Sequence, residues 1–421
     1  MMDKRALAAI LTIVLVVLTT AMALFIMHLI DDRREYPNIT ADDLGRFLLP
    51  EDLALNETIM EHVVLAGDYL LNHIERGGRW DYEYDAQRDD SLGSYNILRH
   101  AGTTYSLALI FKYTAEPRFY NGTIRSLNNL LSHYLIFGVI DGEQVAYLES
   151  GGLVKLGGAA LAALAVSEVE RIDPMAHYER ELERLGQFIV EMQKEDGSFQ
   201  CFYKHREDEH SDYYPGEALL ALSKLYDLYR DEEFLGTLTK GLEHYNGYFP
   251  SSYSAYTPWA TEAMVYAYEW TKNVSYVGKS FAMADACMSG QIKPGQSSDD
   301  AVIGAFSQDP TSATASRLEG IVDSYLLAHL SNDTAHQYKY GASMVLGADF
   351  LMGFQLNASD VEDLPDPSDS LGGVPTSLND LRIRIDNVQH TVVVLLKIAV
   401  YPSNEGRMFV LNGPPSYYRP H

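Results

Sequence analysis

The stretch Lys155-Leu-Gly-Gly-Ala-Ala-Leu-Ala-Ala-Leu-Ala-Val166 contains no polar or charged side chain after its first residue. Wound as a helix it is apolar on every side, which is typical of a helix in a protein interior. The stretch Glu179-Arg-Glu-Leu-Glu-Arg184, which comes shortly afterwards, carries charges that predict a solvent-exposed helix face. The chain therefore alternates here between an inner helix and an outer one.

The same alternation of an amphipathic helix with an Ala-, Gly-, Leu- and Tyr-rich helix occurs six times along the chain. An internal repeat of this kind defines the whole architecture. It predicts an all-α fold, an (α/α)6 toroid of six helical hairpins with strands nearly absent, and leaves an open α-solenoid as the alternative. The predicted pairs are 57–76 with 94–113, 119–137 with 152–169, 174–193 with 214–229, 231–245 with 258–271, 275–289 with 314–330, and 334–354 with 383–399.

The connections between these helices are unequal in length. Those from an outer to an inner helix are long, such as 194–213 and 355–382, whereas those from an inner to the next outer helix are short. Long loops inside a compact domain are usually functional. The face on which the inner helices begin is therefore predicted to be the working face.

The N-terminus predicts a membrane anchor. Lys4 and Arg5 precede an apolar run over residues 6–30, which exceeds the roughly 20 residues that a spanning helix needs. We predict a cytoplasmic N-terminus (1–5), a transmembrane signal anchor (6–30), a tether (31–55) and an extracytoplasmic toroid domain (56–421). A signal peptide cleaved after Ala21-Met-Ala23 is the alternative. Export agrees with six Asn-x-Ser/Thr sequons at Asn38, Asn56, Asn121, Asn273, Asn332 and Asn357.

Composition narrows the set of partners. The net charge of −26, from 58 acidic and 32 basic residues, disfavours nucleic acid, which requires a clustered basic surface. Two cysteines, Cys201 and Cys287, are too few for a disulfide scaffold and match no zinc motif, and whether they pair stays open. We expect no cofactor, since no Gly-rich phosphate loop occurs. We expect no metal, since the charges of residues 205–212 are consecutive and lack ligand spacing, which favours a solvated loop.

The six pairs, the aromatic and acidic openings of the inner helices, and the turn Gln193-Lys-Glu-Asp-Gly-Ser-Phe199 resemble the six-hairpin (α/α)6-barrel superfamily of carbohydrate-active proteins. The resemblance covers about residues 57–400 and lies at the level of architecture. It implies a carbohydrate ligand. The superfamily includes glycoside hydrolases, unsaturated-uronyl hydrolases, polysaccharide lyases and sugar epimerases, so no one family's catalytic residues can be carried over.

Two carboxylates are candidates for hydrolysis. Glu217 and Glu262 lie at corresponding openings of neighbouring predicted inner helices, and glycoside hydrolysis usually requires two carboxylates across the scissile bond. The alternative is structural, because an acidic residue in the first turn of a helix is stabilised by the helix dipole.

Two histidines are candidates for proton transfer. His100 and His390 lie on the first and last predicted inner helices, which become neighbours when the toroid closes, so the two imidazoles are expected to face each other. Such a pair suits abstraction and return of a proton. Asp386 lies four residues before His390 and is expected to orient it. The alternative is a structural network in which Arg99 pairs with Asp386.

Sugar sites combine aromatic surfaces with a few directional polar groups. On this basis the predicted substrate-binding residues are Trp80, Asp81, Tyr84, Tyr95, Arg99, Glu149, Tyr213, Tyr214, Tyr256, Trp259, Arg384 and Gln389. Three functions follow as hypotheses: a glycoside hydrolase acting on a surface glycan or oligosaccharide first, a sugar (uronate) epimerase or lyase second, and a non-catalytic glycan-binding or scaffold domain third.

The anchor hypothesis predicts a fractionation result. The full chain is expected to remain in the membrane pellet after alkaline carbonate washing, because residues 6–30 are long and apolar enough to span a bilayer. A variant lacking these residues should appear in the supernatant. Release of a mature chain beginning directly after Ala23 would instead establish a cleaved signal peptide.

Overall fold

The computed structural model describes residues 50–173, 177–204, 212–246, 253–308, 310 and 313–400. The chain divides into two compact units, Met1–Asn38 and Ile39–His421, and every described residue belongs to the second. The predicted cytoplasmic segment, the signal anchor and residues 31–49 of the tether lie outside the described residues. Within the described part of the chain, no helix combines the length and apolarity needed to cross a membrane.

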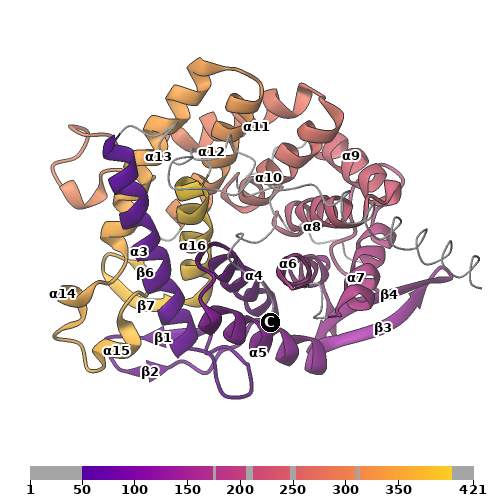
Figure 1. Ribbon diagram of the computed structural model, residues 1–421, viewed down its shortest axis with the longest axis horizontal. Helices are drawn as coiled ribbons and strands as arrows, with labels where there is room; N and C mark the ends of the chain where they lie inside the picture. Colours follow the sequence, from indigo (N-terminus) through magenta and orange to yellow (C-terminus); the bar gives the residue numbers. More distant parts are fainter. Residues whose placement is uncertain are drawn as a thin grey trace, which may run out of the picture. The chain divides into compact units, whose positions relative to one another are not determined.

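The described helices form two concentric layers (Figure 1). The outer layer consists of α3 (Pro50–Asn72), α5 (Pro117–Tyr134), α7 (Glu179–Glu191), α9 (Glu232–Asn246), α11 (Ser275–Met288) and α13 (Thr334–Phe354). The inner layer consists of α4 (Ile97–Thr114), α6 (Leu156–Ile172), α8 (Tyr214–Tyr229), α10 (Tyr253–Thr271), α12 (Ala313–Leu330) and α16 (Ile385–Val400). These twelve helices confirm the predicted (α/α)6 arrangement.

Contacts between the inner helices close the layer into a toroid. Each inner helix packs against the next, and α16 contacts both α12 and α4 (Figure 1). An open solenoid would leave its first and last inner helices apart. The contact between α16 and α4 therefore excludes that alternative.

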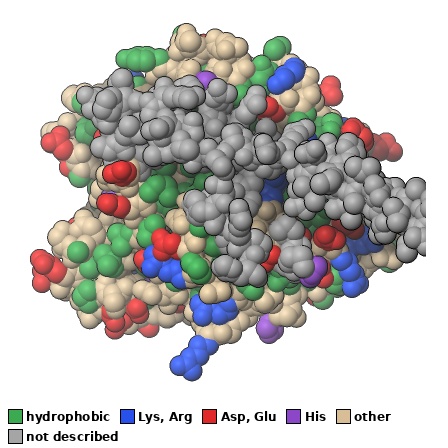
Figure 2. Space-filling model, viewed as in Figure 1, with side chains coloured by type: hydrophobic (Ala, Val, Ile, Leu, Met, Phe, Trp, Pro, Cys, Tyr) green, Lys and Arg blue, Asp and Glu red, His purple; other side chains and the backbone are tan. Residues whose placement is uncertain are grey.

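The composition of each helix explains its layer. Every residue of α6 except Arg171 is buried, as expected for an Ala- and Leu-rich helix surrounded by other helices. In α7, by contrast, the buried residues follow a helical period along one face, and the remaining charged side chains lie toward solvent. On the face shown in Figure 2, basic side chains lie singly among acidic ones rather than in an extended patch of the described surface.

The prediction of an all-α fold is wrong in detail, because the long loops contain two small antiparallel sheets. One has the order β2-β1-β7-β6 and the other the order β3-β4-β5. The strands are β1 (Glu83–Asp85), β2 (Asp90–Ser91), β3 (Leu135–Ile140), β4 (Glu143–Ser150), β5 (Leu153–Val154), β6 (Pro375–Ser377) and β7 (Asp380–Arg384). The same loops also contain the short helices η2 (Asp300–Val302), α14 (Ala358–Val361) and α15 (Pro367–Ser370).

The hairpin of β3 and β4 shows why the sequence interpretation failed there. The outer helix was predicted to continue to residue 137, but α5 ends at Tyr134 and the chain turns into Leu-Ile-Phe-Gly-Val-Ile, a segment rich in β-branched and aromatic residues. Asp141 and Gly142 then adopt positive φ angles of 50° and 102°. Asp-Gly at two positive-φ positions is a strong hairpin signal, so the information was present in the sequence.

Several helix starts also differ from the prediction, and α4, α6 and α7 begin three, four and five residues later than expected. The first outer helix begins at Pro50 rather than at residue 57. The inner helix α10 begins at Tyr253 and continues through Pro258, which was predicted to be its first residue. Both cysteines are buried and form no disulfide.

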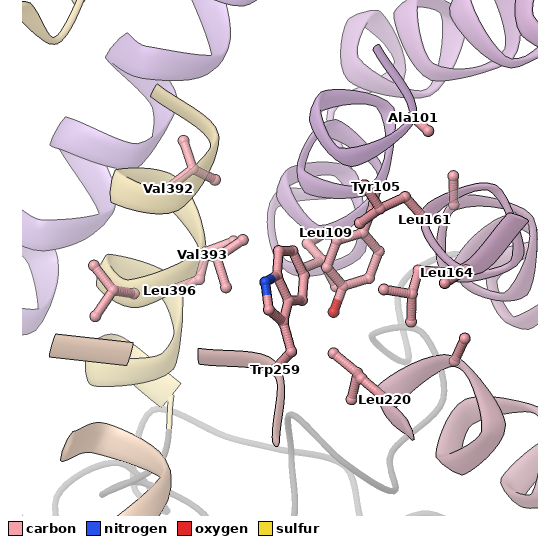
Figure 3. Close-up of a cluster of buried hydrophobic side chains, with 14 of the residues drawn as sticks. Ala101, Tyr105, Leu109, Leu161, Leu164, Leu220, Trp259, Val392, Val393 and Leu396 are labelled. Carbon is pink, nitrogen blue, oxygen red and sulfur yellow. The ribbon is translucent and has the colours of Figure 1, made fainter. Parts of the chain in front are cut away.

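The centre of the toroid is filled by an apolar layer, shown in Figure 3. Trp259 of α10 and Tyr105 of α4 lie between Val393 of α16 on one side and Leu161 and Leu164 of α6 on the other. All five side chains are at most 3% exposed. The toroid is therefore a packed body and not a channel.

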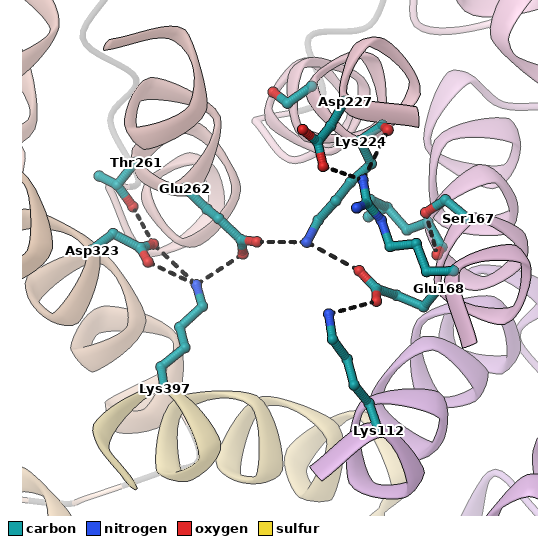
Figure 4. A network of polar contacts seen from close by, with 12 residues as sticks. Lys112, Ser167, Glu168, Lys224, Asp227, Thr261, Glu262, Asp323 and Lys397 are labelled. Carbon is teal, nitrogen blue, oxygen red and sulfur yellow. Dashed lines mark hydrogen bonds and ion pairs between the residues drawn. The ribbon is translucent and has the colours of Figure 1, made fainter. Parts of the chain in front are cut away.

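A chain of ion pairs, shown in Figure 4, takes one charged residue from each inner helix. In order along the contacts it consists of Lys112 (α4), Glu168 (α6), Lys224 (α8), Glu262 (α10), Lys397 (α16) and Asp323 (α12). The nitrogen–oxygen distances of these pairs run from 2.9 to 3.2 Å, and every side chain is at most 2% exposed. We call these six residues the ion chain.

The ion chain predicts a large loss of stability when one ammonium group is removed. The variant Lys397→Met leaves the buried carboxylates of Glu262 and Asp323 without their shared cation. Breaking a buried pair in this way costs about 3–5 kcal/mol, so the free energy of unfolding in urea should fall by about that amount. Lys339→Met, which removes an exposed pair with Asp285, should cost less than about 1 kcal/mol. Equal small losses for both variants would contradict a structural role for the ion chain.

Candidate functional site

The candidate site lies at the N-terminal ends of four inner helices. Each inner helix follows an antiparallel outer one, so all inner helices begin on the same face of the toroid, the face that carries the long loops. Glu217 and Asp386 lie in the first turns of α8 and α16, and Arg99 lies near the start of α4. Glu319 and His390 lie about one turn deeper, on α12 and α16. We call these five residues the polar cluster.

His390 and Glu319 form a dyad. Nδ1 of His390 lies 2.7 Å from Oε1 of Glu319, and the two side chains are 12% and 2% exposed. A carboxylate oxygen accepts a hydrogen bond, so Nδ1 is the donor and Nε2 of a neutral His390 keeps its lone pair. The edge of the Trp259 ring packs against the imidazole with centroids 5.7 Å apart. The dyad therefore holds the imidazole in one tautomer and one orientation, suitable for a general base.

Glu217 has the environment of a carboxylic acid that keeps its proton. Burial raises its pKa to about 7, while the nearby charges of Arg99 and His390 oppose this effect. Its Oε2 atom is buried and has no hydrogen-bond partner among the described residues. A Cβ atom at position 157 would lie 2.1 Å from this oxygen, so Gly157 of α6 makes the room in which the carboxyl group sits. A group of this kind can donate a proton near neutral pH.

Asp386 holds two arginines. Arg384 donates from Nε and a terminal nitrogen to the two oxygens of Asp386, at 2.9 and 2.5 Å, and Nε of Arg99 lies 3.1 Å away. Burial alone would raise the pKa of Asp386, but Arg99 and Arg384 keep it below its ordinary value. The guanidinium of Arg99 lies over the Tyr213 ring and that of Arg384 over the Tyr82 ring, at 5.8 and 5.5 Å from the centroids. The predicted pairing of Arg99 with Asp386 is thus observed.

The expectation that Asp386 orients His390 is wrong. The carboxylate of Asp386 is engaged by the two arginines, and the imidazole instead contacts Glu319. Sequence reasoning missed Glu319 as a site residue. The signal that would have found it is the opening Arg317-Leu-Glu319-Gly of the fifth inner helix, which carries a carboxylate as the opening of the third one does.

The placement of Glu262 beside Glu217 is also wrong. Because α10 begins at Tyr253, Glu262 lies about two and a half turns into the helix, whereas Glu217 lies in the first turn of α8. Burial favours the neutral form of Glu262, but Lys397 and Lys224 outweigh it and keep its pKa below the usual range. Both ammonium groups lie within about 3 Å of its oxygens, at 2.9 and 3.1 Å. Glu262 therefore belongs to the ion chain and not to the polar cluster.

His100 does not face His390. Its Nε2 atom lies 3.0 Å from the carbonyl oxygen of Ser126 on the outer helix α5, and its Nδ1 lies 2.9 Å from the hydroxyl of Tyr95. Burial lowers the pKa of His100 to about 4. The side chain is fully buried and neutral, and its contacts tie α4 to α5. The expected pair of facing histidines is therefore not formed.

The predicted substrate-binding residues fall into two groups. Arg99, Arg384, Tyr213, Tyr214 and Trp259 lie in or against the polar cluster, although Trp259 is buried beneath His390 and offers no open surface. The others do not line it: Trp80, Tyr84, Tyr256 and Gln389 are buried, Asp81 accepts from Ser91, Tyr95 stacks on Tyr134, and Glu149 is exposed on β4. The aromatic residues were misassigned because packing and ligand binding favour the same side chains.

No protein-family model and no curated protein sequence matches this chain. Solved structures do share its fold. A D-mannose isomerase superposes with a TM-score of 0.61 at 12% identity, over 87% of this chain and 99% of the isomerase. An inactive α-1,6-mannanase of glycoside hydrolase family 76 from Salegentibacter sp., in complex with α-1,6-mannotriose, has a TM-score of 0.58 at 12% identity, over 81% and 99%. A family 76 α-mannanase from Bacteroides thetaiotaomicron has a TM-score of 0.58 at 10% identity, over 82% and 96%. These similarities establish the six-hairpin fold.

Glu217 predicts a pH dependence of stability. Its pKa is raised by folding, so between about pH 4.5 and 7 the folded chain holds a proton that the unfolded chain releases. Its contribution to stability is therefore present at low pH and is lost as pH rises through this window. Glu217→Gln removes the ionisable group and with it this pH dependence. The free energy of unfolding of the variant should therefore increase relative to that of the wild type from pH 4.5 to 8, by about 3 kcal/mol at most. Urea unfolding of both proteins at several pH values measures this difference, and parallel curves would contradict the buried, protonated state of Glu217.

Proposed function

We propose that this chain is a carbohydrate-active enzyme that isomerises or epimerises a sugar by proton transfer, with His390 as the base and Glu217 as the acid. The observation that carries the proposal is the His390–Glu319 dyad beside the buried carboxyl group of Glu217. The polar cluster thus contains both a group that can accept a proton, His390, and a group that can donate one, Glu217. Fold similarity to a D-mannose isomerase also supports the proposal of a sugar-isomerising enzyme.

In the proposed reaction, Nε2 of His390 removes the proton from the carbon next to the carbonyl group of an open-chain sugar. The electron pair of the C–H bond forms a C=C bond, and the carbonyl oxygen takes the proton of Glu217 to give an enediol. For isomerisation, His390 returns the proton to the former carbonyl carbon while the Glu217 carboxylate takes the proton of the other enediol hydroxyl, whose oxygen becomes the new carbonyl oxygen. For epimerisation, the enediol turns its other face to His390, which returns the proton to the original carbon while Glu217 takes back the proton that it gave to the oxygen. Glu319 stabilises the imidazolium that forms in between.

Glycoside hydrolysis is the second candidate, and the raised pKa of Glu217 favours it, because a general acid must hold its proton near neutral pH. Glu262, however, is engaged by two lysines and cannot serve as its partner. The mannanase neighbour was inactivated by replacing two adjacent aspartates with asparagine. In the described part of this chain such pairs occur at Asp89–Asp90 and Asp299–Asp300, which are exposed and lie outside the polar cluster. For these reasons we propose hydrolysis only as the second candidate.

We also retain the proposal that the toroid acts outside the cytoplasm on an N-terminal anchor. The anchor rests on residues 6–30, which lie outside the described residues. Exposure of the sequon residues Asn121, Asn273, Asn332 and Asn357 is compatible with glycan attachment.

The proposal predicts exchange of solvent deuterium into a substrate sugar. Incubation of the full chain in D2O with a panel of aldoses and ketoses, followed by NMR, should show deuterium at the carbon next to the carbonyl group. His390→Asn should reduce the exchange rate by about 100-fold or more, the usual contribution of a general base. His336→Asn is a matched control, because His336 also contacts a carboxylate, Asp333, through Nδ1 at 2.7 Å, but on the outer helix α13. Its exchange rate should equal that of the wild type.

Other results would decide against proton transfer. Release of reducing ends from oligosaccharides without deuterium uptake, with loss in Glu217→Gln and not in His390→Asn, would establish hydrolysis instead. Sugar binding with neither reaction across the panel would establish the non-catalytic alternative.

A further inference from the structure

The arginine pair at the polar cluster is not balanced by its carboxylate. Asp386 supplies one negative charge, whereas Arg99 and Arg384 supply two positive charges. Of the other two acidic groups in the polar cluster, Glu217 is neutral below about pH 7, and Glu319 contacts His390 and neither arginine. Glu83 lies across the β1–β7 ladder from Arg384, but its carboxylate lies 3.9 Å from Arg382, which Asp380 also pairs. The charge of Glu83 also acts on Arg384, but without a direct ion pair. Among the described residues, Asp386 is therefore the one carboxylate that pairs directly with Arg99 and Arg384.

Both arginines are held rigidly and still reach solvent. The side chain of Arg99 is 20% exposed and that of Arg384 is 36% exposed, whereas Asp386 is only 6% exposed. Each guanidinium is held by Asp386 and also lies over a tyrosine ring, Tyr213 or Tyr82. Asp386 engages only Nε of Arg99, and only Nε and one terminal nitrogen of Arg384. Neither arginine forms an ion pair with any other of the described residues, so the remaining donor nitrogens stay available to a ligand.

Two preorganised guanidinium groups that share one carboxylate are suited to a second carboxylate, because Arg binds planar anions through parallel hydrogen bonds. We propose that the sugar bound at the polar cluster is anionic, a uronate whose carboxylate contacts Arg99 and Arg384. The chain as a whole carries a net charge of −26 and repels anions, so binding an anionic sugar requires a local cationic group such as this arginine pair. This proposal adds a substrate class to the function proposed above. It rests on that function only because it assumes that the sugar binds at the polar cluster.

The geometry also orients such a substrate. Arg99 is close enough to Glu217 for its charge to act on that carboxyl group, and His390 acts on the same group. A carboxylate on the arginines would therefore anchor one end of the sugar while the reacting carbon lies between Glu217 and His390. Binding energy from the anchored end then positions the reacting end.

The test compares charged and neutral sugars that are otherwise alike. Dissociation constants of the full chain are measured by NMR titration at low salt for glucuronate, galacturonate and mannuronate and for glucose, galactose and mannose. We expect each uronate to bind about 10- to 100-fold more tightly than its neutral counterpart, the range for hydrogen bonds to a charged group. Arg384→Met should abolish most of this preference, and Arg384→Lys, which keeps the charge, should restore part of it.

Arg382→Met is the matched control. Arg382 lies two residues earlier on β7, is 47% exposed and pairs with Asp380, so its loss should leave the preference unchanged. Equal affinities for charged and neutral sugars would overturn the proposal, as would a preference that persists in Arg384→Met. A preference that depends on Arg384 without deuterium exchange would leave the anionic site standing and remove the isomerase. Deuterium exchange into neutral sugars that depends on His390, without any preference for uronates, would support the isomerase and overturn the anionic site.

Discussion

The ion chain is the constraint on which the rest of this toroid depends. It takes one residue from each inner helix, and its three lysines and three carboxylates give no net charge. Removing any one group would leave an opposite charge buried and uncompensated, which costs several kcal/mol. The six helices therefore have one register in which every charge finds its partner. Lys224 adds to this by lying over the rings of Tyr105 and Tyr266.

The polar cluster and the ion chain use the same residue types at different depths. Glu217 and Lys224 lie on one helix, separated by seven residues or about 10 Å along its axis. Near the helix start, the carboxyl group of Glu217 beside Gly157 forms no ion pair with a described residue, and burial raises its pKa to about 7, so it keeps its proton below that pH. Deeper in the toroid, Glu262 lies between two ammonium groups and loses it. Between the two levels lies the apolar layer of Trp259 and Tyr105 (Figure 3). Because that layer excludes charge, the proton held by Glu217 is available to a ligand and separate from the structural ions.

Most of the fold could be predicted from the sequence, because it follows from local patterns. The boundaries of α8 and α13 agree residue by residue with those expected, since Pro215 marks the start of one and Asp333 caps the other. The β3–β4 hairpin was missed because its apolar residues were read as the end of a helix, despite Asp141-Gly142. The site was predicted in part. Glu217, Arg99, Asp386 and His390 do gather at the helix starts, whereas Glu262 and His100 do not.

The sequence by itself determined which helices are inner and outer, how many pairs there are, and which face carries the long loops. These properties follow from the periodicity and composition of segments of about 20 residues, so residues close together in the chain are enough to determine them. Only the tertiary structure decided the partner of each charged side chain. His390 meets Glu319 across 71 residues, and Lys397 meets Asp323 across 74. The protonation and role of a carboxyl group depend on burial and on charges from other helices, so Glu217 and Glu262, alike in sequence context, differ in chemistry.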